Sequence, residues 1–254
     1  MILGAQLYTV RMFTQNETDF ARSMKRVADI GYKTVQLSAA GKIAPKRIRE
    51  ICDDNGLEIV LTHTDPERIR TDIQNVIEDH QAMGCRYVGM GSMPDRYRNA
   101  EWIGYFSEDY LASAKALKAA GMKLMYHNHH FEWAKMPDGR TLMDALLESM
   151  PADLMGITLD TYWVQAAGED VAAYFAKVAD RLQCVHYKDY AIVNGTPRLD
   201  AIGRGHIDFK TLTAQLKKQG TTEFVLVEQD DCYGESPFAC LKDSYEHIMK
   251  HCGF

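Results

Sequence analysis

The sequence predicts an α/β protein, and within that class a single (β/α)₈ barrel over residues 1–254. Eight short β-rich runs alternate with longer amphipathic segments along the whole chain. The runs carry buried-type residues on both faces, which favours a parallel sheet covered by helices. No linker rich in Pro, Ser or Gly interrupts the pattern, and 254 residues is close to the usual barrel length of about 250 residues.

The eight expected strands are short runs of aliphatic, aromatic and β-branched residues, such as Ile59-Val60-Leu61. They lie near residues 4–10, 33–38, 58–63, 86–91, 122–128, 155–160, 183–188 and 223–229. A doubly wound open sheet is the alternative with the same alternation of elements. That fold would place a Gly-rich phosphate turn after its first strand, whereas residues 9–14 contain no glycine. The barrel is therefore preferred.

Helix-boundary residues mark the segments between the strands: Asn, Asp, Ser or Pro at the start and Gly at or after the end. The expected helices run from Asn16 to Gly31, Pro45 to Gly56, Pro66 to Gly84, Asp208 to Gly220 and Ser236 to about His251. Asp208 is expected to cap its helix through the side chain.

Composition excludes several classes of partner. With 29 Lys and Arg against 35 Asp and Glu, the net charge of −6 gives no field that attracts nucleic acid or an anionic membrane. The N-terminus has no basic and apolar leader pattern and no stretch is long enough to span a membrane, so we expect a cytoplasmic protein. The six cysteines form no Cys-x-x-Cys pair, and free thiols are expected.

Polar residues gather where the last four strands of the barrel end, which is where barrel enzymes carry their active groups. Because side chains alternate across a strand, His127 and His129 share one side of strand five, and Glu228 shares the side of Leu226. Asp160 ends strand six and His186 lies on strand seven. Such a mixture of oxygen and nitrogen ligands suits Mn²⁺, Mg²⁺, Co²⁺ or Zn²⁺. The competing interpretation pairs the buried carboxylates with a cation such as Lys188.

Several segments carry a resemblance to a known family: residues 126–133 (Tyr-His-Asn-His-His-Phe-Glu-Trp), Leu159-Asp160-Thr161, residues 185–189, residues 203–209 and Glu228. The chain resembles the xylose isomerase-like TIM barrel superfamily, in particular its sugar (phosphate) isomerase/epimerase branch, which includes tagatose epimerases, hydroxypyruvate isomerase and inosose dehydratase. The resemblance implies one divalent metal ion, held by Glu132, Asp160, His186 and Glu228.

Two positions depart from that family pattern. Some members carry the first carboxylate ligand inside strand five, where this chain has His-Asn-His, so Asn128 and His129 are alternatives to Glu132. The epimerases carry a substrate-contacting His three residues after the Asp, where this chain has Trp163.

The expected reaction is a sugar isomerisation or epimerisation, in which a proton is removed next to a carbonyl and a metal-stabilised enediolate forms. The candidate catalytic residues are Glu228, His129 and Glu132. The candidate substrate-binding residues are Gln6, Tyr8, His63, His127, Trp163, Lys188 and Arg204. His63 and Arg204 are also compatible with purely structural roles.

The main alternative reaction is a lyase or dehydratase acting on a keto-sugar, keto-inositol or 3-keto-glycoside. The cluster of His127, His129 and His130 keeps it open, because elimination needs an acid as well as a base. A metal-dependent DNA repair nuclease is disfavoured by the net charge of −6. A sugar-binding barrel without activity is the non-enzymatic alternative. A homo-oligomer is compatible with the sequence, and aromatic residues between Tyr97 and Tyr110 offer either packing or a subunit contact.

Overall fold

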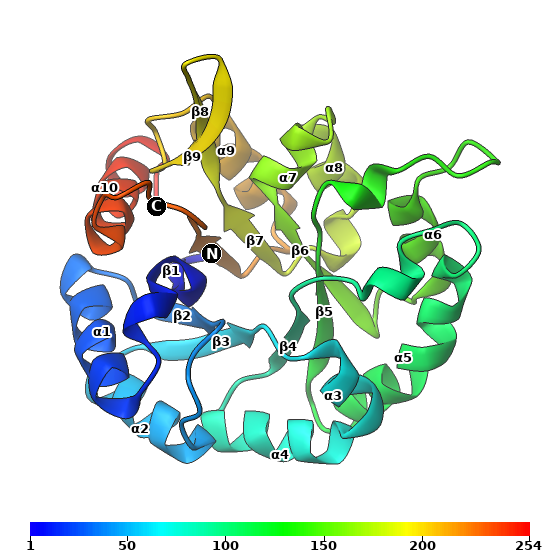
Figure 1. Cartoon of the computed structure of the whole chain (residues 1–254), viewed down its shortest axis with the longest axis horizontal. Coiled ribbons are helices and arrows are strands. Elements are labelled where there is room, and N and C mark those ends of the chain that lie inside the picture. The colour runs from blue at the N-terminus through cyan, green and yellow to red at the C-terminus, as the bar shows by residue number, and fades with distance from the viewer.

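Eight parallel strands close into a barrel in the computed structural model, which describes residues 1–254 (Figure 1). Around the barrel the order is β1-β10-β7-β6-β5-β4-β3-β2. The strands are β1 (Ile2–Gln6), β2 (Thr34–Leu37), β3 (Glu58–Thr62), β4 (Tyr87–Met90), β5 (Lys123–His127), β6 (Met155–Asp160), β7 (Cys184–Tyr187) and β10 (Phe224–Val227). The predicted (β/α)₈ class is confirmed.

The helices form a ring outside the strands (Figure 1). They are α1 (Glu17–Ile30), α2 (Pro45–Asp54), α3 (Pro66–Thr71), α4 (Ile73–Met83), α5 (Ile103–Ala119), α6 (Leu142–Ser149), α7 (Thr161–Ala166), α8 (Val171–Lys177), α9 (Phe209–Gln219) and α10 (Pro237–His251). Short 3₁₀ turns lie at η1 (Leu7–Phe13), η2 (Asp95–Tyr97), η3 (Phe131–Trp133) and η4 (Ala179–Arg181). None of these helices combines the length and the hydrophobicity that a membrane span requires.

Most predicted boundaries agree with the structure to within two residues. The expected strand at 4–10 is wrong in its second half: β1 ends at Gln6, whose side-chain oxygen accepts the Tyr8 N–H and turns the chain into η1. The expected helix from Pro66 to Gly84 is divided at Asp72, whose backbone angles (φ −136°, ψ 36°) are not helical. Asp208 caps α9 as predicted, by accepting the Thr211 N–H.

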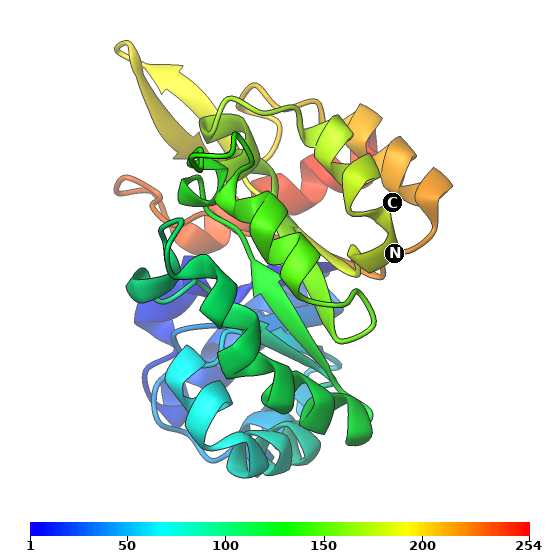
Figure 2. The ribbon, with the colours of Figure 1, turned by 90° about the vertical axis from the view of Figure 1, so that its right-hand side faces the viewer.

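A two-stranded hairpin after β7 is absent from the sequence prediction. It consists of β8 (Asp189–Val193) and β9 (Thr196–Asp200), and it projects beyond the rest of the molecule (Figure 2). Its turn is Asn194–Gly195, with φ of 51° and 78°, the left-handed angles of a type I′ turn. The Asn-Gly pair was the signal that could have found it.

Asp189 anchors this hairpin to the loop that follows it. Its buried carboxylate accepts backbone N–H bonds of 3.0–3.2 Å from four residues of that loop: Gly203, Gly205, His206 and Ile207. The glycine-containing motif at 203–209 therefore serves to build a fixed loop next to Lys188, the residue that precedes Asp189 in the chain.

The barrel interior is filled by a small apolar layer below the strand ends. Its members are all buried: Val60, Leu61, Tyr87, Met125, Cys184, Phe224 and Leu226. Three of the polar residues at the strand ends follow an interior residue by two positions: His127 follows Met125, His186 follows Cys184 and Glu228 follows Leu226. The strand period of two therefore aims their side chains into the barrel mouth.

A larger apolar cluster of 60 buried residues lies between the strands and the helices. Tyr97, Phe106 and Tyr110 belong to it and pack edge to face or tilted, so these members of the aromatic stretch serve the core. Trp102 and Tyr105 of the same stretch are exposed. All six cysteines are free thiols, as predicted.

Gly89 lies where β4 closely approaches β3. A Cβ added there would lie 2.1 Å from the backbone oxygen of Thr62 on β3, so the strands would have to separate. We expect Gly89→Ala to lower the free energy of unfolding by ~2 kcal/mol or more, measured by urea denaturation. The control is Gly104→Ala in α5, where no atom lies within 4 Å of the added group. It should be neutral or stabilising by up to ~1 kcal/mol, and an equal loss in both variants would contradict the close approach.

Candidate metal centre

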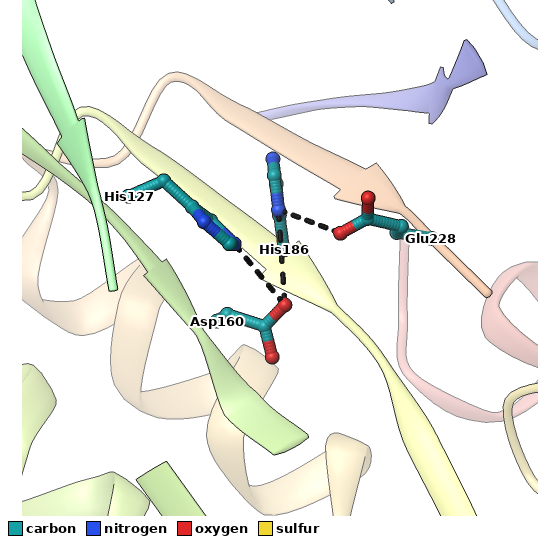
Figure 3. Close-up of side chains that lie close together, drawn as sticks. All are labelled: His127, Asp160, His186 and Glu228. Atoms are coloured by element: carbon teal, nitrogen blue, oxygen red, sulfur yellow. Dashed lines mark hydrogen bonds and ion pairs between the residues drawn. The ribbon is translucent and has the colours of Figure 1, made fainter. Parts of the chain in front are cut away.

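Four buried side chains converge at the carboxyl ends of neighbouring strands (Figure 3). His127 ends β5, Asp160 ends β6, His186 lies on β7 and Glu228 follows β10. One potential ligand atom from each residue lies within 4.8 Å of the other three. The close-up shows the four groups pointing toward one another from four strands that are adjacent in the barrel.

The two imidazoles are oriented by hydrogen bonds on their outer nitrogens. His127 Nδ1 lies 3.0 Å from the backbone oxygen of Gly91, and His186 Nε2 lies 2.6 Å from Gln36 Oε1. Because both partners are oxygen acceptors, these nitrogens carry the ring protons. The opposite nitrogens, His127 Nε2 and His186 Nδ1, then present lone pairs to the centre, which is the arrangement of metal-ligating histidines.

The two carboxylates are oriented in the same way. Asp160 Oδ1 accepts the Trp163 N–H (3.1 Å) as the N-cap of α7, and Glu228 Oε1 accepts from Gln6 Nε2 (2.6 Å). The Asp160 N–H is in turn fixed by Asn128 Oδ1 (2.9 Å). Asp160 Oδ2 and Glu228 Oε2 are thereby left facing the histidine nitrogens, because the hydrogen bonds to Asp160 Oδ1 and Glu228 Oε1 hold each carboxylate in place, as around metal-binding carboxylates.

The donor set fits a divalent cation. His186 Nδ1 is buried and has no hydrogen-bond partner, and it lies 3.0 Å from Glu228 Oε2. His127 Nε2 lies 3.3 Å from Asp160 Oδ2. Lone-pair atoms at such distances repel one another unless a cation or a proton lies between them. Two imidazole nitrogens and two carboxylate oxygens are ligands for Zn²⁺, Mn²⁺ and related ions.

Lys188 brings a positive charge to the same oxygens. Its side chain is buried, and Nζ lies 3.0 Å from Asp160 Oδ2, 2.9 Å from Glu228 Oε2 and 3.1 Å from Asp230. Burial disfavours the ammonium form, but the three carboxylates outweigh it and raise the pKa of Lys188. Conversely, burial would raise the pKa values of Asp160 and Glu228, and the charge of Lys188 holds both below their usual range. The ion pairing considered from the sequence is therefore present.

Other ionisable groups near the centre have shifted pKa values. Burial, together with the negative charge of Glu228, raises the pKa of Asp230 to about 6. Burial lowers the pKa of His129 to about 3, with a further contribution from His127, and burial also lowers the pKa of His63. Burial lowers the pKa of His127, but the hydrogen bond to Asp160 and the negative charges of Asp160 and Glu228 together outweigh burial and raise it. Near neutral pH, His129 and His63 are thus uncharged.

A cavity of about 270 Å³ lies beside the four side chains, and His127 and Glu228 reach its lining. Six of the residues expected to act on a substrate line it: Tyr8, His63, His127, His129, Lys188 and Glu228. Ser38, Gly91, Ser92 and Asp230 complete the lining. The site is therefore a polar well at the end of the barrel where barrel enzymes bind their substrates.

Glu132 lies away from this well. It belongs to η3, and its carboxylate accepts the Tyr126 O–H (2.6 Å) and the His129 N–H (2.9 Å). Tyr126 points to the helix side of β5, where it packs against Phe106 of α5, so Glu132 lies on the opposite side of the strand from His127. The structure brings His127, rather than Glu132, to the cluster with Asp160, His186 and Glu228.

The remaining expected residues have different surroundings. Gln6 supports Glu228, as described above. Trp163 packs against His129 and His130, with ring centroids 5.3 and 5.2 Å apart, outside the cavity lining. Arg204 is exposed and pairs with Asp200, Glu235 and Asp243, so the structure does not bring it to the cavity.

Asp230 and Gln36, which contact Lys188 and His186, are among the residues of the site that were not identified from the sequence. Asp230 could have been found by continuing the alternation beyond Glu228, because both lie on the same side of the chain. Gln36 could not, since it is one polar residue inside a short buried strand and its partner His186 is 150 positions away. Only the closed barrel places β2 opposite β7.

The donor set can be tested by metal content. Purified protein is expected to bind one divalent ion per chain, and His127→Gln should weaken that binding at least ~10-fold by removing a ligand nitrogen. Glu132→Gln should keep the ion while losing ~1–3 kcal/mol of stability, because an amide cannot accept both hydrogen bonds. Elemental analysis and titration with Mn²⁺ measure the first effect, and urea unfolding the second. Loss of the ion in Glu132→Gln with retention in His127→Gln would contradict this donor set.

Comparison with known proteins agrees with this architecture. An inosose dehydratase of Geobacillus kaustophilus is 23% identical over 267 aligned residues, covering 89% of this chain and 85% of the relative. A sugar phosphate isomerase/epimerase structure from Parabacteroides distasonis superimposes with a TM-score of 0.82 at 21% identity, over 97% of this chain and 92% of that one. The structure of a xylose isomerase-like TIM barrel protein from Mycobacterium smegmatis, in complex with magnesium, superimposes with a TM-score of 0.76 at 14% identity, over 99% of this chain and 96% of that one. The likeness to these two structures shows the shared fold. Residues 24–250 match the family model for the xylose isomerase-like TIM barrel, and the chain belongs to that family.

Proposed function

We propose that the protein is a divalent-metal-dependent isomerase or epimerase of a small sugar, which works by removing a proton next to a carbonyl group. One observation carries the proposal: a buried cluster of four ligand side chains meets a polar cavity of about 270 Å³, which two of the four, His127 and Glu228, line. A cavity of this size lies at the small end of ligand pockets and suits a monosaccharide-sized molecule. Membership of the family and the similarity to a sugar phosphate isomerase/epimerase support the same reaction class.

His127, Asp160, His186 and Glu228 would hold the ion, each oriented by the partner described above. A bound divalent ion supplies a Lewis acid that polarises a carbonyl oxygen and its neighbouring hydroxyl. Glu132 we assign a positioning role, because its carboxylate holds the backbone N–H of His129 and thereby the imidazole that lines the cavity.

Proton transfer would fall to the groups that line the cavity and can accept a proton. These are the carboxylates of Glu228 and Asp230 and the Nδ1 atom of His129, which has no hydrogen-bond partner. Lys188 donates toward the same region and would stabilise negative charge that develops on the substrate. Tyr8, Ser38, His63 and Ser92 supply further polar groups in the cavity lining that would bind substrate hydroxyls.

A lyase that removes water or an alcohol from a keto-sugar or keto-inositol is the second candidate. The curated relative covering 89% of this chain is an inosose dehydratase. Elimination also requires an acid beside the base, and the raised pKa of Asp230, about 6, leaves part of that carboxyl protonated near neutral pH. Both candidates share the proton abstraction and differ in what leaves afterwards.

Deuterium exchange tests both candidates together and product analysis separates them. The metal-loaded protein is incubated in D₂O with ketoses, keto-inositols and 3-keto-glycosides. We expect deuterium at the carbon next to the carbonyl of at least one compound, with rearranged sugar for an isomerase and loss of water or aglycone for a lyase.

Glu228→Gln should lower the exchange rate at least ~100-fold, because it removes a carboxylate from the centre. The matched control is Glu235→Gln, whose carboxylate pairs with Arg204 on the surface and should leave the rate unchanged. The absence of exchange with every compound, while a divalent ion is bound, would contradict the proposed proton abstraction.

A further inference from the structure

Lys188 is the one cation buried among the carboxylates of the centre. The side chain is 2% exposed, and Nζ has one carboxylate for each of its three N–H groups: Asp160, Glu228 and Asp230. Two of these, Asp160 and Glu228, supply the oxygens that face the histidine nitrogens. The lysine therefore shares its two nearest oxygens with the ion of the proposed function.

Lys188 neutralises part of the negative charge of the three carboxylates. The three carboxylates carry three negative charges and Lys188 carries one positive charge, while each imidazole is neutral when it presents a lone pair. One divalent ion brings the sum to zero. Without Lys188, three carboxylates that are wholly or largely buried would face one another with no cation, which is costly in a low dielectric.

The carboxylate oxygens that bond to Lys188 can bind a divalent ion at the same time. A carboxylate oxygen has two lone-pair directions, so Asp160 Oδ2 and Glu228 Oε2 can each accept from Lys188 and bind an ion on the other side. The ammonium group would then lie one oxygen away from the ion. Two positive charges at that separation repel strongly where water is excluded.

We propose that Lys188 is a built-in counter-ion of the metal centre: it keeps the donor oxygens in place before the ion binds, and it lowers the affinity for that ion. The inference rests on the divalent-ion site of the proposed function. Asp230 contributes to this role, because its carboxylate pairs with Lys188 on the cavity side and neutralises part of the charge of the lysine. Lys188 is thus a positioning residue in addition to any contact with substrate.

Lys188→Met provides the direct test, because methionine keeps an unbranched side chain and removes the charge. Metal-free protein is titrated with Mn²⁺ by calorimetry, and thermal unfolding is followed with and without Mn²⁺. We expect binding at least ~10-fold tighter than in the wild type, a lower melting temperature without metal, and a larger rise of that temperature when Mn²⁺ is added. Unchanged or weaker binding would overturn the counter-ion role.

Asp230→Asn tests the same idea with Lys188 and every ligand in place. Lys188 then has only Asp160 and Glu228 as charged partners, so Mn²⁺ should bind at least ~5-fold more weakly. Most of that loss should disappear in the Lys188→Met background, where Asp230 has no lysine to neutralise. A loss of equal size in both backgrounds would mean that Asp230 does not act through Lys188. If metal-free Lys188→Met fails to fold, the single variant Asp230→Asn decides: Mn²⁺ binding that is unchanged or tighter would overturn the counter-ion role.

Lys177→Met is the matched control, since Lys177 pairs with Asp144 outside the centre, and it should not change Mn²⁺ affinity. The outcomes separate the two proposals. A wild-type protein that binds no divalent ion would overturn the metal site and this inference together. Binding by the wild type with the same affinity in Lys188→Met would overturn the inference alone.

Discussion

The concentration of charge at the carboxyl end of the barrel is the constraint on which the rest of the site depends. Asp160 and Glu228 are almost completely excluded from water, and Asp230 is mostly buried beside them. Such groups are stable only when cations and hydrogen bonds compensate them. Neighbouring elements satisfy this need: β1 supplies Gln6, and Lys188 follows β7 directly. β7 also supplies His186, which Gln36 of β2 orients.

Much of the fold could be predicted because local and global signals agree in this chain. The β-rich runs, the helix caps such as Asp208, and the glycines after helices each point to the same alternation of elements. The predictions of strand and loop boundaries are wrong where a side chain overrides the local pattern. Gln6 turns the chain after β1 although the residues beyond it are strand-forming types. The Asn194–Gly195 turn closes a hairpin within a connection that a simple strand–helix alternation does not anticipate.

The candidate site was predictable where the two-residue period of a strand applies. Asp160, His186 and Glu228 lie within one residue of the carboxyl ends of their strands, and the structure places them together. The period stops being informative in the loop after β5, where Glu132 is five residues beyond His127 and the 3₁₀ turn sends it to the helix side. Partners such as Gln36 depend on which strands meet across the barrel, and that is a property of the closed sheet rather than of any segment.

The seven-residue apolar layer beneath the ligands has a kinetic consequence. Because buried side chains fill the lower barrel, the well above them is closed toward the opposite end of the barrel. In the proposed reaction, a product molecule would therefore leave from the same end of the barrel at which its precursor arrived. Turnover therefore requires the entrance to be vacated between successive molecules, and accumulated product competes directly with fresh substrate for the same route.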